Sequence, residues 1–163
     1  MNGDPHLYKI LNDLKIDFSY DEHPPAPTIE IAKKYWKDLD ARHCKNLFFR
    51  NHKGNKHYLV ILDHNQDMSI HDLEKILRQG KLTFASEQRM MKYLAINPGS
   101  VSPFGLINDI THHVYLFIDE NLQSAERISF HPNINTATLT VAFPDFIRFL
   151  EWTKNGFEFV RLY

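Results

Sequence analysis

The stretch Cys44-Lys45-Asn46-Leu47-Phe48-Phe49-Arg50-Asn51, followed by His57-Tyr58-Leu59-Val60-Ile61-Leu62-Asp63, decides the fold of this chain. Both segments are apolar and rich in aromatic and aliphatic residues, which is typical of buried strands. The polar segment from Asn51 to Asn55, which includes Gly54, supplies a turn between them. The sequence therefore predicts a hairpin at the centre of a sheet.

Alternation along the first of these strands separates its chemical groups. Because successive side chains point to opposite faces, Lys45 shares a face with Leu47 and Phe49, and Cys44 faces the other way. A Cys44–Lys45 nucleophile pair is therefore disfavoured, and Cys44 is expected to be a core thiol. A lysine within an apolar strand must reach a cleft or find a partner. A lysine that protects an edge strand from aggregation is the equally weighted alternative.

The elements around the hairpin are predicted from periodicity and from helix-start signals. Asp4 and Pro5 open a helix over residues 5–15, and Thr28 can cap another. Further helices are expected over 68–77, 86–94 and 144–152, and strands over 16–20, 114–118, 127–130, 136–141 and 157–162. This pattern predicts an α/β (α+β) fold, a mixed sheet with helices packed on it, within one domain over residues 1–163.

Composition places the chain among ordinary globular proteins. Hydrophobic residues make up 43% and charged residues 24% of its 163 residues. The single cysteine excludes an internal disulfide and fits a reducing compartment. No apolar run reaches the roughly 20 residues that span a bilayer, and Met1-Asn2-Gly3-Asp4-Pro5 does not have the pattern of a signal peptide. We therefore expect a cytoplasmic protein without a membrane partner.

Charge is distributed unevenly along the chain. The net charge is −1, but residues 33–56 hold eight lysines and arginines against Asp38 and Asp40, a local +6 that a remaining −7 offsets. Such a patch fits docking onto a short phosphate segment rather than wrapping of a long duplex. A face of solvated lysines without a ligand is the equally weighted alternative.

Two further segments carry candidate chemistry. Gly99-Ser100-Val101-Ser102-Pro103-Phe104-Gly105 is a tight loop whose free backbone N–H groups can hold a carbonyl oxygen or a phosphate. A simple connection is the commoner outcome for such a loop. His131 ends a strand before Pro132, where it can bond a substrate amino group or orient a water. A lone histidine more often caps a turn.

Several kinds of site are not predicted. The chain has no glycine-rich phosphate loop, no Cys-x-x-Cys pair and no His-Glu-x-x-His helix. His112 and His113 are adjacent, but neighbours on a strand point to opposite faces and cannot share a metal. We therefore expect neither a metal nor a cofactor. Ser100 and Ser102 lie outside any Gly-x-Ser-x-Gly elbow, so a serine hydrolase is a weaker alternative.

Taken in order, five motifs resemble the YbaK/ProX family of prolyl-tRNA synthetase-associated editing domains, above all its free-standing ProX (PrdX) branch of Ala-tRNA(Pro) deacylases. The motifs are His23-Pro24-Pro25 with Thr28, Lys45-Asn46-Leu47-Phe48, Phe84-Ala85-Ser86-Glu87, Gly99 to Asp109, and His131-Pro132-Asn133 with Asn135-Thr136. The resemblance covers nearly the whole chain. It implies a largely antiparallel mixed sheet with helices around a cleft, and hydrolysis of the ester between a mischarged amino acid and the terminal adenosine of tRNA.

The resemblance also implies roles for residues. Lys45, Gly99 and His131 would be catalytic, and the segment from Pro24 to Lys37 would form one wall of the amino-acid pocket. The expected substrate-binding residues are Pro25, Thr28, Ile29, Ile31, Asn46, Ser100, Ser102 and Phe130. The expected tRNA contacts are Lys33, Lys37, Arg50 and Lys53. The partners would be the acceptor end of tRNA(Pro) and, where the domain docks, prolyl-tRNA synthetase.

An aminoacyl ester is already activated, and no nucleophile with a matched base is apparent, so we expect direct attack by water. Backbone N–H groups near Gly99 would hold the developing oxyanion, and Lys45 would fix the ester and add positive charge. The resemblance implies that the neighbouring ribose hydroxyl helps to activate the water. Hydrolysis of Cys-tRNA(Pro) is the nearest alternative activity, and a non-catalytic adaptor for tRNA or a synthetase is the alternative class.

Overall fold

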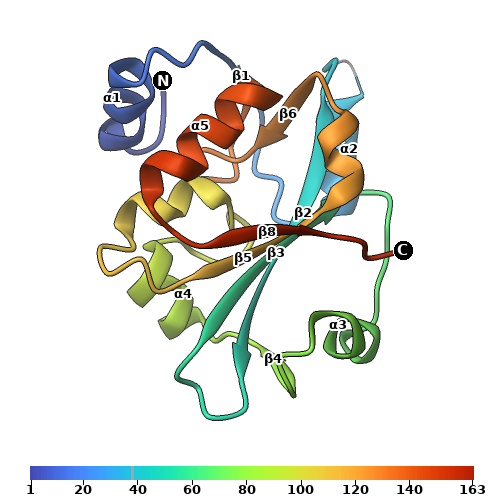
Figure 1. Cartoon of the computed structure of the whole chain (residues 1–163). Coiled ribbons are helices and arrows are strands. Elements are labelled where there is room, and N and C mark those ends of the chain that lie inside the picture. The colour runs from blue at the N-terminus through green and yellow to red at the C-terminus, as the bar shows by residue number, and fades with distance from the viewer. Residues whose placement is uncertain (38) are drawn as a thin grey trace.

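An eight-stranded mixed sheet forms the centre of the computed structural model, which describes residues 1–37 and 39–163 (Figure 1). The strand order is β1-β7-β6-β2-β3-β5-β8, and β4 pairs with β2 outside this path. Four of the seven pairings are antiparallel and three are parallel. The expected mixed, mostly antiparallel sheet is therefore confirmed. Asp38, counted above in the basic window, lies outside the described residues.

The expected helices and strands are present, with boundaries that differ by a few residues. The strands are β1 (Phe18–Glu22), β2 (Arg42–Asn51), β3 (His57–Asp63), β4 (Leu82–Phe84), β5 (Tyr115–Asp119), β6 (Arg127–Phe130), β7 (Ala137–Ala142) and β8 (Phe157–Val160). The helices are α1 (Pro5–Asp13), α2 (Ile29–Trp36), α3 (Ile70–Leu77), α4 (Glu87–Leu94) and α5 (Phe143–Thr153), with 3₁₀ turns at η1 (Pro103–Asn108) and η2 (Glu120–Ser124).

The central hairpin divides the core into two layers. β2 and β3 pair in antiparallel register from Cys44↔Asp63 to Arg50↔His57. Alternation along β3 directs Leu59 and Ile61 into one cluster, and Val60 into the other. The first cluster also contains side chains of α1, α4 and α5, whereas the second contains those of α3. The sheet is thus covered by helices on both faces, and α3 lies apart from α1 and α5 in Figure 1.

Short polar side chains start the helices as the sequence predicts. The Asp4 carboxylate accepts a hydrogen bond from the backbone N–H of His6 at 2.9 Å, and Pro5 begins α1. The Thr28 and Ser86 hydroxyls accept at 3.3 Å from backbone N–H groups in the first turns of α2 and α4. These caps fix where the two helices next to the site begin.

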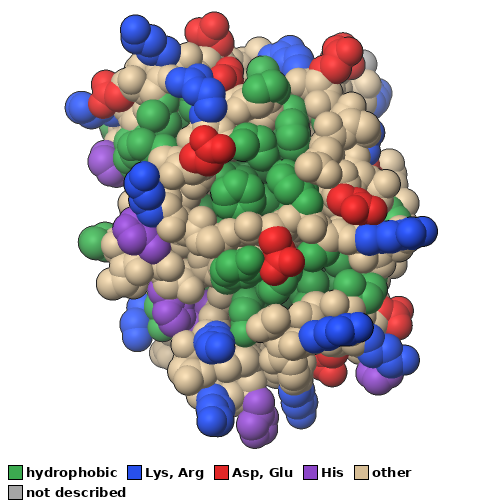
Figure 2. Space-filling model, in the orientation of Figure 1, with side chains coloured by type: hydrophobic (Ala, Val, Ile, Leu, Met, Phe, Trp, Pro, Cys, Tyr) green, Lys and Arg blue, Asp and Glu red, His purple; other side chains and the backbone are tan. Residues whose placement is uncertain are grey.

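The face shown in Figure 2 carries hydrophobic side chains over α5 and β8, with charged groups around them. Phe143, Phe157 and Phe159 pack there against the first core cluster and are only partly buried. Across residues 1–37 and 39–163, no helix combines the length and the apolar character that a bilayer span requires.

One edge of β2 pairs with β3 along most of its length. The other edge pairs with β6 near its start and with β4 near its end, and the gap between these two pairings positions the site. β6 pairs in parallel with Arg42 and His43, and β4 pairs in antiparallel register with residues 49–51. Within the described ranges no strand pairs with this edge between those two segments. Lys45 and Asn46 therefore lie on an interior strand at an opening in the sheet, so the reading of Lys45 as an edge-strand lysine does not apply.

Candidate active site

A cavity of about 280 Å³ opens at the split edge of β2. Its walls come from the extended segment before α2, from α2 itself, from β2, β4 and α4, from the loop after α4, and from β6. The residues expected from the sequence that line it are Thr28, Ile29, Lys45, Asn46, Gly99, Phe130 and His131. The three expected catalytic residues, which are far apart in the sequence, thus share one cavity.

Lys45 is a cation at the cavity wall that is held by the loop after β3. Its Nζ donates to the carbonyl oxygen of Gln66 at 2.7 Å and forms an ion pair with the Asp67 carboxylate. The Lys45 side chain is 17% exposed, whereas that of Asp67 is 95% exposed. The hydrogen bond and charge of Lys45 lower the pKa of Asp67. The ammonium is therefore fixed in place by a carboxylate that water already surrounds.

The side chains of β2 point to the two faces of the sheet as the sequence predicts. Cys44 and Phe48 belong to the first core cluster, whereas Leu47 and Phe49 contact the second. Burial raises the pKa of the Cys44 thiol well above its usual value, which disfavours the thiolate and fits a core thiol.

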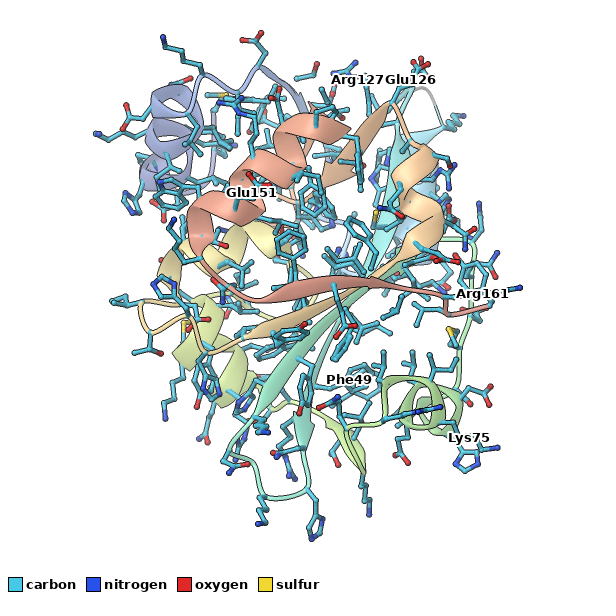
Figure 3. The ribbon with its side chains drawn as sticks, viewed as in Figure 1. Phe49, Lys75, Glu126, Arg127, Glu151 and Arg161 are labelled. Carbon is cyan, nitrogen blue, oxygen red and sulfur yellow. The ribbon has the colours of Figure 1, made fainter. Side chains whose placement is uncertain are left out.

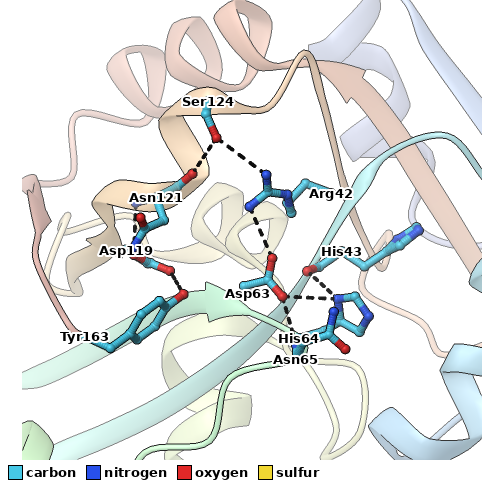
Figure 4. Close-up of polar contacts among 9 residues, drawn as sticks. All are labelled: Arg42, His43, Asp63, His64, Asn65, Asp119, Asn121, Ser124 and Tyr163. Carbon is cyan, nitrogen blue, oxygen red and sulfur yellow. Dashed lines mark hydrogen bonds and ion pairs between the residues drawn. The ribbon is translucent and has the colours of Figure 1, made fainter.

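A polar network anchors the start of β2 beside the cavity (Figure 4). Arg42 Nη1 donates to Asp63 Oδ2 at 3.2 Å, and Arg42 also reaches the Ser124 hydroxyl. The backbone N–H of His64 donates to the carbonyl of His43 at 3.0 Å. These contacts join β2 to the end of β3 immediately before Lys45, and so restrict where the lysine can stand.

Asn46 presents backbone and side-chain polar groups at the split edge. The Phe48 carbonyl accepts from Ala85 N–H on the side away from β3. Because backbone directions repeat every two residues, the N–H and C=O of Asn46 also point away from β3, toward the opening. Asn46 Oδ1 is buried and has no hydrogen-bond partner among the described residues. Buried acceptors are normally satisfied, so this one marks a place for a donor.

Gly99 stands at the third position of a tight turn. The Ser100 N–H donates to the Asn97 carbonyl at 3.2 Å, and Gly99 has φ +85°, which makes Asn97–Ser100 a type II turn with Pro98 at its second position. A Cβ at Gly99 would lie 3.1 Å from the Cα and the carbonyl oxygen of Pro27. Glycine is thus required both by the backbone conformation and by the close approach of the opposite wall.

His131 is held in a defined orientation and protonation state. Its Nδ1 lies 2.9 Å from the carbonyl oxygen of Ala137, an acceptor, so Nδ1 carries the proton and Nε2 keeps a lone pair. Burial, and to a lesser extent the nearby His23, lower the pKa of His131, although the Ala137 carbonyl opposes this. At neutral pH the ring is a neutral hydrogen-bond acceptor at the cavity wall. The turn contact that the sequence suggested as an alternative role is therefore present as well.

Ser129 and His43 belong to the site, but sequence reasoning did not find them. Ser129 lines the cavity, and its hydroxyl is hydrogen-bonded to Nδ1 of His43. Trp36 stacks on the His43 ring with centroids 4.6 Å apart and planes 4° apart. Burial lowers the pKa of His43 to about 4, so the ring stays neutral. The two residues meet because β2 and β6 pair in parallel with His43 opposite Ser129. No local sequence pattern predicts such a parallel pairing.

Some of the expected residues lie elsewhere. Pro25 is exposed and Ile31 half-buried, and Ser100 and Ser102 are buried within the loop after α4; none of the four lines the cavity. The Ser102 hydroxyl instead caps η1 by accepting from Phe104 N–H at 3.1 Å. Within the described ranges, no three His, Cys, Asp or Glu side chains are grouped as metal ligands.

The expected tRNA contacts divide into two places. Lys33 on α2 is exposed, and its charge helps to lower the pKa of Asp67, which places it on the Lys45 side of the molecule. Lys37 follows α2 and is also exposed. Lys53 lies in the hairpin turn, and Arg50 bonds to backbone carbonyls of that turn. The basic window therefore extends from the cavity rim to the hairpin tip.

The family comparison gives the class of protein to which this fold and site belong. The model of the aminoacyl-tRNA editing domain matches residues 23–149, a span that includes Lys45, Gly99 and His131. The chain belongs to this family of aminoacyl-tRNA editing domains, whose reaction is hydrolysis of an aminoacyl ester. The resemblance, the fold class and the hydrolase class expected from the sequence are confirmed.

Individual relatives extend the match to nearly the whole chain. The prolyl-tRNA editing protein ProX of Acetoanaerobium sticklandii is 38% identical over 152 residues, which is 93% of each chain. The prolyl-tRNA synthetase associated domain-containing protein 1 of Xenopus laevis is 32% identical over 158 residues, 94% of each chain. A solved structure provisionally described as a trans-editing enzyme for prolyl-tRNA synthetase superimposes with a TM-score of 0.69 at 17% identity, covering 98% of this chain and 99% of that one.

Proposed function

We propose that residues 1–163 act as one trans-editing deacylase domain that hydrolyses Ala-tRNA(Pro), in the cytoplasm. One observation carries the proposal: Lys45, Gly99 and His131, from three distant segments, line a single cavity at an opening in the sheet. The 38% identity to ProX, a prolyl-tRNA editing protein, supports tRNA(Pro) as the substrate, and the relatives named for prolyl-tRNA synthetase support that enzyme as a docking partner.

The polar groups around the cavity suit attack by water on an ester. Gly99 N–H has no acceptor within the described part of the chain, so it is free to bond the carbonyl oxygen as negative charge develops. His131 Nε2 is a neutral acceptor that can orient the water or receive the substrate amino group. Asn46 Oδ1 is a second acceptor for that ammonium group. The ribose hydroxyl beside the ester supplies further help in activating the water.

Lys45 acts in this proposal through its charge and position. A phosphate or ester oxygen of the substrate can replace the Asp67 carboxylate, because an ion pair to an almost fully exposed carboxylate costs little to break. Lys33 adds charge on the same side, and Lys37, Arg50 and Lys53 extend the basic surface along which an acceptor stem would lie.

Small side chains and one large one limit the amino acid that fits. Ala26 and Ala32 are each 1% exposed and line the cavity together with Trp36, and Pro27 packs closely against Gly99. Such a closed end admits alanine and rejects the larger proline ring by steric overlap. Cysteine is only slightly larger than alanine, so Cys-tRNA(Pro) is the competing substrate.

The test compares two lysine variants on Ala-tRNA(Pro). Lys45→Ala removes the cation at the cavity, and we expect kcat/KM to fall by about 10²-fold or more, the usual effect of losing a positioning or charge-stabilising group. Lys75→Ala is the matched control, because Lys75 projects from α3 on the surface (Figure 3). Activity of Lys45→Ala within a few-fold of the control would contradict the assignment. A substrate without the neighbouring ribose hydroxyl should be hydrolysed much more slowly by the unaltered protein.

A further inference from the structure

Phe84 is an exposed aromatic side chain held at the rim of the cavity. It is 51% exposed, although it lines the same cavity as Lys45 and Gly99. Its ring stacks on that of Phe49, with centroids 4.7 Å apart and planes 26° apart. Phe49 is fully buried between the sheet and α3 (Figure 3) and is the register partner of Phe84 across the β2–β4 pair. The exposed ring therefore rests on a rigid support and keeps one face open to a ligand.

The position of Phe84 relative to the reacting groups follows from the strand register. Lys45 and Phe49 share a face of β2 and are four residues apart, which is about 13 Å at the rise of an extended strand. His131 follows β6, which pairs with the opposite end of β2 at His43. The cavity thus extends along β2 from Ser129, which lies opposite His43, past Lys45 to Phe84. Phe84 marks the end farthest from the small closed pocket.

The two ends of the cavity differ in what they can hold. Ala26, Ala32 and Trp36 enclose one end, which suits a small aminoacyl group. The other end is bounded by an exposed aromatic face, which suits a flat group that remains partly in solvent. The total volume of about 280 Å³ lies just below the range of pockets for drug-sized ligands, and so exceeds the needs of an alanyl group.

Bases of single-stranded nucleic acid recurrently use such exposed aromatic faces. Unpaired bases stack on aromatic side chains, and the interaction tolerates any base because each has a π face. We propose that Phe84 is the stacking platform for the base of the terminal nucleotide that carries the ester, an inference that rests on the proposed function. The base would lie on Phe84, its sugar would place the ester near Lys45 and Gly99, and the amino acid would enter the closed end.

The direct test is a short RNA whose terminal base is 2-aminopurine, a fluorescent base that is quenched when it stacks. Titration with the unaltered protein should quench the fluorescence. Phe84→Ala and Phe84→Leu should abolish most of the quenching and weaken binding by about 5- to 150-fold, the range for loss of one stacking aromatic. Phe84→Trp should retain both effects. Trp152→Ala is the matched control, because Trp152 is an aromatic of similar exposure (42%) on α5, outside the cavity.

A second arm separates this inference from the proposed function. Phe84→Ala should raise KM for Ala-tRNA(Pro), whereas the control Trp152→Ala should leave that KM unaltered. If the unaltered protein deacylates Ala-tRNA(Pro) and Phe84→Ala does so with the same KM and the same quenching, the stacking platform is wrong and the deacylase stands. If the unaltered protein neither hydrolyses Ala-tRNA(Pro) nor quenches the 2-aminopurine strand, both are wrong. Quenching that depends on Phe84 without hydrolysis would support the base site and overturn the deacylase.

Discussion

Replacing Gly99 with alanine should damage the site more than it damages the fold, and Gly80 provides the matched control. Both glycines have positive φ, +85° at Gly99 and +77° at Gly80. An L-residue held in the left-handed region costs about 1–2 kcal/mol, and the smaller entropy of the unfolded alanine chain returns about 0.4–1 kcal/mol. The net loss of unfolding free energy from the backbone alone is therefore about 1 kcal/mol at either position.

The surroundings of the two glycines differ. A Cβ at Gly80 meets no heavy atom within 4 Å, whereas a Cβ at Gly99 lies 3.1 Å from the Cα and the carbonyl oxygen of Pro27. Pro27 or the turn must therefore move by a few tenths of an ångström, which shifts both the pocket wall and Gly99 N–H. Displacement of a reacting group by about 1 Å can cost 10²-fold in rate, so a shift of this size should cost about tenfold or more.

Two assays measure the two effects. Urea unfolding should give losses of about 1 kcal/mol for Gly80→Ala and somewhat more for Gly99→Ala. Deacylation of Ala-tRNA(Pro) should be unaltered in Gly80→Ala and reduced by about tenfold or more in Gly99→Ala. Equal activity of the two variants at saturating and at low substrate would refute the reasoning, because the contact with Pro27 would then have no bearing on the site.

Three further outcomes are expected. Asp67→Asn should strengthen tRNA binding at low salt, because Lys45 loses its charged competitor; unchanged or weaker binding would contradict this. His131→Asn should lower kcat with little effect on the unfolding free energy, and an unchanged kcat would exclude His131 from the reaction. The free energy of unfolding should fall as pH drops from about 6.5 to 4. Burial lowers the pKa of His43 and of His57 to about 4, so over this range only the unfolded chain takes up their protons. The loss of unfolding free energy is at most about 3 kcal/mol for each histidine. A flat unfolding free energy over this range would contradict it.

Most of the fold could be predicted from local patterns because its elements are long and periodic. The β2–β3 hairpin, the Asp4 and Ser86 caps, and the faces of β2 all follow from side-chain spacing and from short polar groups at helix starts. β4 was not predicted, because its three residues are too few to show alternation. Its existence depends on pairing with β2, a contact that no local pattern records.

The site could be predicted only in part, for reasons that lie in tertiary structure. Lys45 and Gly99 stood out because each is chemically unusual in its segment, a charge in an apolar strand and a glycine in a turn. Ser102 was expected to face the substrate, but its hydroxyl serves as a cap, a competing use that Ser residues before a Pro-led turn often have. Ser129 was missed because the parallel pairing with β2 alone brings it to the cavity.

The measurement that tests the central claim most directly is a deacylation panel with the unaltered protein and four substrates, tRNA(Pro) charged with alanine, cysteine, serine or proline. The closed end of the cavity, with Ala26, Ala32 and Trp36 around it, predicts the highest kcat/KM for alanine and negligible hydrolysis of the proline ester. Hydrolysis of the proline ester at a rate similar to that of the alanine ester, or no hydrolysis of any of the four, would contradict the account.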